Sequence, residues 1–168
     1  IADFLKMEPP QCFIYDSQKC LIDSEGIKIP RLEISSRLVR EFSKMELTHV
    51  LAKEMYHIKV GHIRTEVMSD KIMNLIEAIP NLPGINIIKN VGGDIPFSAG
   101  AFHFRSISFK WFKVACFSAD NFATVYTGSF SDSIRALLLG VFNERKLVNE
   151  IDLKHFIDQI GEIESCTG

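Results

Sequence analysis

The feature that most constrains the fold is residues 44–62, which have the apolar spacing of one long helix. Most of its apolar side chains fall at helical spacings, and these residues are Met45, Leu47, Val50, Leu51, Met55, Ile58 and Val60. Ser43 precedes the segment and Glu46 follows three residues later, a pair typical of a capping box. Gly61 is suited to end the helix. The sequence therefore predicts a helix of about five turns on which other elements pack.

Strand patterns come before this helix. Residues 12–16 are rich in β-branched and aromatic side chains, which predicts a short strand that ends in a turn. Residues 19–23 are the expected hairpin partner of that strand. Residues 31–35 alternate apolar and polar side chains, which predicts a further strand, and Ser36 then opens a helical turn.

The middle of the chain predicts two helices separated by a long loop. Residues 66–78 form a helical candidate that is stopped by Pro80. Residues 80–103 are rich in glycine and proline and are expected to be a loop, within which residues 85–88 favour a strand. Residues 104–126 are apolar and aromatic and are predicted to be a long buried helix.

Two more helices are expected toward the C-terminal end. Ser131 or Asp132 can cap a helix that runs to about residue 144. Asp152 can cap a second one over residues 153–160. Most of the chain is thus predicted to be helical, with a small sheet near its start.

The length and composition favour a single domain over residues 1–168, and the predicted elements make it α+β and mostly α. A chain of 168 residues with 46% hydrophobic residues and a mean hydropathy of +0.11 can bury a sizeable core. The net charge of -2 and the pI of about 6.2 argue against nucleic acid as a partner. No run of about eighteen apolar residues occurs, so no membrane span is predicted.

The cysteines bear on the cellular compartment. Cys12, Cys20, Cys116 and Cys166 form no C-x-x-C pair, which argues against a zinc ribbon or a thioredoxin-like motif. This usage is typical of a reduced intracellular protein, so a cytoplasmic location is predicted. No basic segment followed by an apolar one opens the sequence, so no signal peptide is predicted.

The chemistry of the central helix lies in the five residues from Lys53 to His57, which are K-E-M-Y-H. In a zinc peptidase the pattern is H-E-x-x-H, where two histidines bind the metal and the glutamate takes a proton from bound water. Glu54 and His57 match two of these positions, but Lys53 replaces the first histidine. A charged lysine has donors and no acceptor, so it cannot bind zinc. The segment thus favours a peptidase scaffold and argues against the peptidase reaction.

Four stretches, in order along the chain, resemble the gluzincin metallopeptidase family that includes HtpX and the CAAX prenyl protease. The central helix THVLAKEMYHIKVGH is similar to AVLAHELGHIKxGH, and the later ISFKWFKVACFSADNFATVYTG is similar to LLRWxRxAExSADRAALLxxQD. The lead-in IPRLEISSRLVREFSKMELTHVLA resembles PxIxxxSGLLxxLxxxELxxVLA, and IDLKHFIDQIGE resembles the closing segment. The resemblance covers roughly residues 10–160 and fits the compact, soluble members of the family best.

This resemblance implies a zincin-like domain with a small sheet packed on the active-site helix. The family's three zinc ligands fall on Lys53, His57 and Cys116, and only His57 keeps the family's residue. The resemblance therefore implies that the ancestral zinc is lost and that no cofactor is bound. Glu54 falls on the general-base position, which is then vestigial, and Asp120 falls on the carboxylate of the SAD motif. The His-Pro motif that many relatives carry near the C-terminus is absent.

One interpretation of the altered site makes Lys53 an internal cation that takes the place of the metal. A buried ammonium is costly unless it is paired, so Asp120 or Glu54 is the expected partner. The alternative is an ordinary lysine on the solvated face of the helix. The position of the Lys53 ammonium relative to these carboxylates separates the two.

Two other interpretations use the remaining ligand-type side chains. His57 and Cys116 are both acceptable zinc ligands, and His49 or His62 are further candidates. His49 lies about two helical turns before His57, and His62 is offset around the helix, so neither is well placed for one ion. Alternatively, Cys116 is a nucleophile with His57 as its base.

The expected function is that of a catalytically inactive metallopeptidase-like protein, a pseudopeptidase, that binds a peptide or protein partner. Addition of an extended peptide to the edge of the sheet is the expected mode. One alternative is a metallopeptidase or other hydrolase with an unusual site built on Glu54, His57 and Cys116. A second alternative is a structural subunit of a larger assembly, which the high phenylalanine content and the positive mean hydropathy favour.

Overall fold

The computed structural model describes residues 1–26, 28–78 and 97–167. It confirms the α+β, mostly α class, because helices dominate around one three-stranded sheet. The elements are α1 (Ala2–Leu5), β1 (Gln11–Tyr15), β2 (Ile22–Glu25), β3 (Arg31–Ser35), α2 (Ser36–Glu41), α3 (Lys44–Val60), α4 (His62–Ala78), α6 (Phe97–Thr127), α7 (Phe130–Phe142), α8 (Arg145–Glu150) and α9 (Leu153–Thr167). None of the helices within the described residues is both long enough and apolar enough to cross a lipid bilayer.

The sheet has the order β1-β3-β2, so β3 lies in the centre. β1 pairs with β3 in parallel, and β2 pairs with β3 in antiparallel orientation. The predicted hairpin between residues 12–16 and 19–23 is therefore wrong, although strands do form at both places. Cys20 is buried in the core, where its backbone N–H donates to Asn143, and this contact takes the chain away from a tight turn. β3 is central because Leu32 and Ile34 bury their side chains.

Local signals set the boundaries of α3 as predicted. The Ser43 side chain accepts a hydrogen bond from the backbone of Glu46, and the Glu46 carboxylate accepts one from the backbone of Ser43, which completes the capping box. Gly61 ends the helix in the left-handed conformation, with φ of 80°. Ser35 caps α2 in a similar way by accepting from Leu38. The long helix that the sequence predicts is thus present between these two signals.

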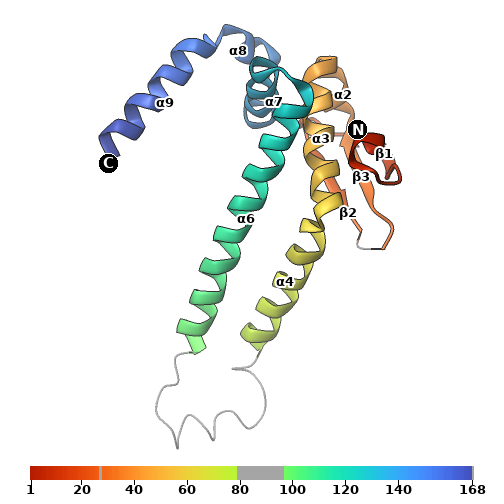
Figure 1. Cartoon of the computed structure of the whole chain (residues 1–168), viewed down its shortest axis with the longest axis vertical. Coiled ribbons are helices and arrows are strands. Elements are labelled where there is room, and N and C mark those ends of the chain that lie inside the picture. The colour runs from red at the N-terminus through yellow and green to blue at the C-terminus, as the bar shows by residue number, and fades with distance from the viewer. Residues whose placement is uncertain (27, 79–96, 168) are drawn as a thin grey trace, which may run out of the picture.

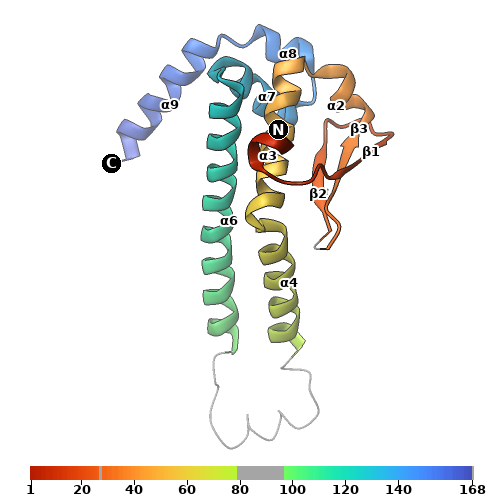
Figure 2. The ribbon, with the colours of Figure 1, turned by 45° about the vertical axis from the view of Figure 1, so that its right-hand side comes forward.

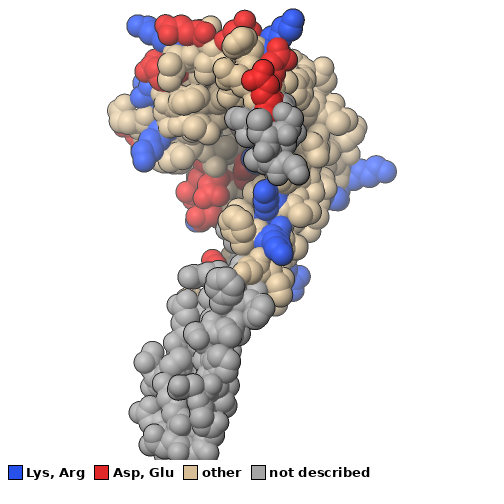
Figure 3. Space-filling view, turned by 90° about the vertical axis from the view of Figure 1, so that its left-hand side faces the viewer, with Lys and Arg blue, Asp and Glu red and all other residues tan. Residues whose placement is uncertain are grey.

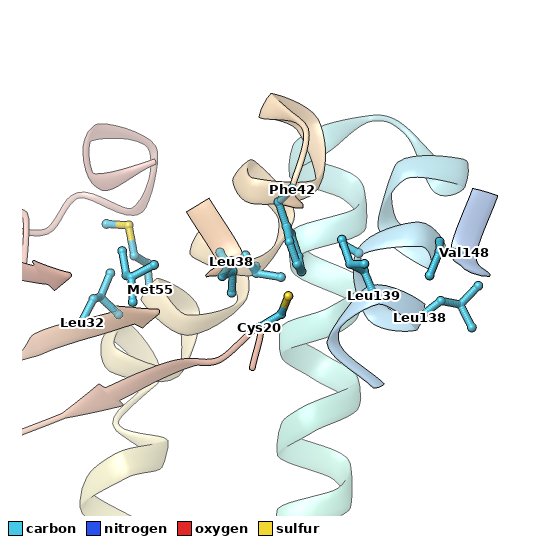
Figure 4. Close-up of a cluster of buried hydrophobic side chains, with 11 residues drawn as sticks. Cys20, Leu32, Leu38, Phe42, Met55, Leu138, Leu139 and Val148 are labelled. Atoms are coloured by element: carbon cyan, nitrogen blue, oxygen red, sulfur yellow. The ribbon is translucent and has the colours of Figure 1, made fainter. Parts of the chain in front are cut away.

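The core lies where the sheet, α2, α3 and α7 meet. Figure 4 shows Cys20, Leu38, Phe42 and Leu139 converging from separate segments of the chain. α3 also packs along α6, and the contact contains small side chains that let two helices approach closely. These side chains are buried, and they are Ala52, Ala115, Ala119 and Ala123.

One buried ion pair ties α3 to α8. Glu46 is only 1% exposed, and its two carboxylate oxygens accept from Arg145 at 2.8 and 2.5 Å. The Arg145 guanidinium also donates to the backbone carbonyl of Glu41. Burial alone would raise the pKa of Glu46, but the hydrogen bonds from Arg145 and Ser43 outweigh it and hold this pKa below its usual value.

α4 and α6 form a long pair that extends away from the core, as Figure 1 and Figure 2 both show. The predicted helix at 104–126 is confirmed, but α6 begins earlier, at Phe97. The prediction that it is buried is wrong for one side of the helix, where Ile107, Phe109, Val114 and Phe117 are exposed. The predicted loop at 80–103 is therefore wrong for residues 97–103. Residues 79–96, which include the proposed strand at 85–88, lie outside the described residues.

The two predicted C-terminal helices are present, and only the first of them has a different cap. α7 is capped by Ser129, whose side chain accepts from the backbone of Asp132, and not by Ser131 or Asp132. Asp152 caps the start of α9 as predicted, by accepting from the next helical N–H groups. The short helix α8 was not predicted, because it has six residues and little periodicity.

Candidate functional site

A small pocket brings most of the predicted site residues together between α3, β2, α4 and α6. Its volume is about 160 Å³. The lining residues are Asp23, Ser24, Lys53, Glu54, His57, His62, Ile63, Phe112, Ala115 and Cys116. This volume is below the usual range of pockets for drug-sized ligands, so the space suits one side chain of a larger partner. A larger hollow of about 490 Å³ beside Met7 and Pro30 holds no comparable group of acids and histidines.

Lys53 lines this pocket and contacts Asp120, which lies outside the lining. Its Nζ atom is 2.7 Å from Asp120 Oδ1, and the two side chains are only 22% and 24% exposed. The contact follows from the packing of α3 on α6, because buried alanines on both sides of the pair let the helices come close. The prediction that Lys53 pairs with a carboxylate is confirmed, and the solvated alternative is wrong.

Glu54 points away from this pair toward the sheet. Ser24 on β2 donates from its Oγ to Glu54 Oε2 over 2.7 Å, so the helix and the strand are joined at the pocket. Burial raises the pKa of Glu54 to about 6, and nearby Asp23 and Asp120 add to the rise, while Ser24 and Lys53 oppose it. The structure thus gives the predicted general-base position a carboxyl that titrates close to neutral pH.

His57 and His62 form a contact that the sequence did not predict. Their Nδ1 atoms are 2.9 Å apart, so one ring donates to the other. Burial lowers the pKa of His57 to about 4, helped by His62 and Lys53, and burial also lowers the pKa of His62. The neutral form of His57 is therefore favoured at pH 7, which leaves one ring nitrogen able to accept in this hydrogen bond. The prediction that His62 is offset from His57 around the helix is wrong. Gly61 adopts the left-handed conformation and redirects the chain between α3 and α4, which brings the two rings together.

The remaining candidates occupy different places. Cys116 lines the pocket on α6, one helical turn before Asp120, so the predicted grouping of Cys116 with Lys53, Glu54 and His57 is present. His49 does not line the pocket. Its ring is fully buried, neither ring nitrogen has a hydrogen-bond partner among the described residues, and burial lowers its pKa.

The donor chemistry of the pocket does not fit the three-ligand zinc site that the resemblance implies. The position of the first ligand carries an ammonium group that is already paired with Asp120. Within the described part of the chain, no three His, Cys, Asp or Glu side chains are arranged to hold a metal ion. No catalytic step through a metal is therefore assigned to these residues.

The backbone of β2 offers a second functional feature beside the pocket. The Ser35 N–H donates to the Leu21 carbonyl, which makes this pair hydrogen-bonded. Hydrogen-bonded pairs alternate along an antiparallel ladder, so Asp23 bonds to β3 while Ile22 and Ser24 direct their backbone groups to the open edge. The Ser24 N–H agrees with this, because the Asp23 carboxylate accepts from it at 2.8 Å. β2 is thus an edge strand next to the pocket, and the outward backbone groups of Ile22 and Ser24 have no backbone partner within the described residues.

Glu54→Gln is expected to raise the free energy of unfolding by about 2 kcal/mol at about pH 8 and by much less at pH 4.5. The folded-state pKa of about 6 exceeds the ordinary value of 4.5, so the fold binds this proton more tightly than the unfolded chain does. That contribution to stability is fully present below pH 4.5 and is lost as the pH rises through 6. Urea unfolding across this range measures the effect.

The control for this prediction is the same change at exposed Glu150 on α8. It should leave stability unchanged at both pH values, because an exposed carboxylate keeps its hydration. His57 is present in wild type and in both variants, so its contribution to the pH dependence of the free energy of unfolding cancels when they are compared. A pH dependence of stability that is the same in wild type and Glu54→Gln would contradict the assignment.

No protein family, no curated protein and no solved structure matches this chain.

Proposed function

We propose that this chain is a pseudopeptidase, a zincin-like domain that binds an extended peptide along the edge of β2 without hydrolysing it. The observation that carries the proposal is the 2.7 Å contact between Asp120 Oδ1 and Nζ of Lys53, a residue that lines the pocket. An ammonium at this position balances a carboxylate, as a metal would. It has no empty orbital with which to polarise a carbonyl or activate water, so the reaction is lost while the cleft keeps its charge balance.

The edge of β2 supports the binding part of the proposal. An incoming strand would bond to the backbone groups of Ile22 and Ser24, and it would displace the Asp23 carboxylate from the Ser24 N–H. Side chains of such a peptide alternate, so every second one would face the pocket beneath β2. A volume of about 160 Å³ accommodates one of them.

Replacing Ser24 tests whether the edge binds peptide. Ser24→Pro removes the edge-facing N–H without breaking the ladder to β3, and it is expected to weaken peptide binding by about tenfold or more. Ser24→Ala is the matched control, because it removes the same hydroxyl but keeps the backbone N–H. Binding is measured by fluorescence anisotropy with members of a library of short synthetic peptides, selected on the wild-type protein.

The outcomes of this experiment separate clearly. Selective loss of binding in Ser24→Pro, with Ser24→Ala close to wild type, is the expected result. Equal binding by both variants would place the peptide elsewhere, and a wild-type protein that retains no library member would overturn the proposal. Far-ultraviolet circular dichroism of both variants checks that the fold is kept.

A second candidate function is hydrolysis, and one observation favours it. The pKa of about 6 at Glu54 suits a general base near neutral pH, and the neutral His57 and Cys116 lie in the same pocket. Under this candidate, Glu54 would activate water or a substrate hydroxyl directly. Peptide hydrolysis that disappears in Glu54→Gln would support this function over the first.

A further inference from the structure

The outer side of α6 carries large apolar side chains that no other described element covers. Ile107, Phe109, Val114 and Phe117 are 66%, 70%, 63% and 58% exposed. Isolated exposed apolar residues are common on proteins, but a group of this kind on one helix marks an interaction surface. The group lies on α6, at the level of the pocket and toward the start of the helix.

Helix geometry makes these residues one continuous face. Ile107, Val114 and Phe117 follow one another at spacings of seven and three, and Phe109, Lys113 and Phe117 follow at spacings of four, so the two rows meet at Phe117 and together span nearly half of the helix surface. The opposite side of the helix contains the buried Ala115, which faces α3 and the pocket. Partner side chains could therefore reach the outer residues without disturbing the core or the candidate site.

Basic residues are interspersed on this same face. Lys110 and Lys113 are exposed there, and the Lys113 ammonium lies 5.7 Å from the centre of the Phe117 ring. Between Phe97 and Ala119 the helix has no aspartate or glutamate, although the whole chain has a net charge of -2. In Figure 3, basic side chains lie among uncharged ones along the described part of the α4 and α6 pair. The acidic excess of the protein thus lies elsewhere.

We propose that the α6 outer face, defined as Ile107, Phe109, Lys110, Lys113, Val114 and Phe117, docks onto an anionic lipid bilayer. A helix that lies in the membrane interface needs apolar side chains that enter the acyl boundary and lysines that reach the headgroups. This face has both, and its lysines complement the negative charge of phosphatidylserine. The contact leaves the β2 edge open and does not depend on the peptide-binding proposal.

Sedimentation with large unilamellar vesicles tests this surface. The full chain should bind vesicles in which about a third of the lipid is phosphatidylserine, and it should bind pure phosphatidylcholine vesicles far more weakly. Replacing both Lys110 and Lys113 with alanine should reduce the affinity by about 25-fold, since each lysine near such a surface contributes about fivefold. Binding should also weaken as salt is added, because the exposed charges are screened.

Two matched variants make the test specific. Phe109→Ser with Phe117→Ser should also lose at least about tenfold, because the apolar contact is removed. Lys44→Ala with Lys146→Ala removes the same charge from exposed sites on α3 and α8 and should bind as wild type does. Circular dichroism confirms that each variant is folded.

Three results would overturn the proposal. These are absence of binding to the anionic vesicles, binding that persists when Lys110 and Lys113 are both alanine, and binding to heparin or polyglutamate in place of vesicles. A change of oligomeric state in the phenylalanine variant without vesicle binding would instead identify the face as a contact between copies of this chain.

Discussion

Lys53→Met is expected to lower the free energy of unfolding by about 2 kcal/mol at pH 7. The substitution keeps the length of the side chain but leaves Asp120 as a carboxylate without its 2.7 Å partner. Fully buried pairs lose about 3–5 kcal/mol when one partner is removed, and fully exposed pairs lose less than about 1 kcal/mol. The side chains here are 22% and 24% exposed, so an intermediate loss follows. Urea unfolding at neutral pH measures it.

The matched control is Arg31→Met on β3. Arg31 also contacts carboxylates, at 2.6 Å from Glu25, but both of those side chains are 48% exposed. Its loss should leave the free energy of unfolding nearly unchanged, because water screens an ion pair this exposed. The double variant Lys53→Met with Asp120→Leu should recover most of the stability, because it leaves no unpaired charge. Equal small losses for Lys53→Met and Arg31→Met would show that the pair is not an internal cation site.

Arg145→Met is expected to have the largest effect on stability, a loss of about 3 kcal/mol. It leaves the 1% exposed Glu46 without both charged hydrogen bonds and leaves the Glu41 carbonyl without its donor. Glu46 also belongs to the capping box of α3, so the helix that holds the site is weakened at its start. Thermal and urea unfolding at pH 7 measure the loss.

The pH dependence of this variant supplies the check. The folded-state pKa of Glu46 is depressed in wild type, so its contribution is present above the ordinary value of 4.5 and is lost as the pH falls through the folded value. The difference between wild type and Arg145→Met should therefore shrink as the pH falls below 4.5. Glu46→Gln combined with Arg145→Met should be more stable than Arg145→Met alone. A difference that stays constant with pH would contradict the role given to the ion pair.

The sequence predicted those parts of the fold whose signals are local. The capping box of Ser43 and Glu46 and the terminating Gly61 lie within or next to α3, so its boundaries could be predicted closely. The order of the sheet could not, because it depends on contacts between distant residues. The contact of Cys20 with Asn143, 123 residues later, draws the chain into the core and prevents the expected hairpin.

In the candidate site, too, the contacts that depend on local spacing could be predicted, and those that depend on distant residues could not. The spacing of Lys53, Glu54 and His57 on one helix placed them together, and the resemblance added Cys116 and Asp120 from the later helix. His62 was not expected in contact with His57, because a straight helix would hold the rings apart and only the left-handed Gly61 brings them together. A glycine between two histidines at a predicted helix end was the available signal.

No sequence pattern predicts the contact between β2 and Glu54. The hydrogen bond from Ser24 to Glu54 joins residues 30 positions apart, and it depends on the register of β2 against β3. That register follows from the burial of Leu32 and Ile34, which is a property of the assembled core.

The central claim is that the pocket beside β2 binds peptide without cleaving it. The direct measurement is mass spectrometry of peptide termini after the wild-type protein and Glu54→Gln are each incubated with the synthetic peptide library, with and without a chelator. We predict that the peptides retained by the protein keep their original termini in every sample. New termini that form with wild type and are absent with Glu54→Gln would contradict the claim and assign a hydrolase activity to this site.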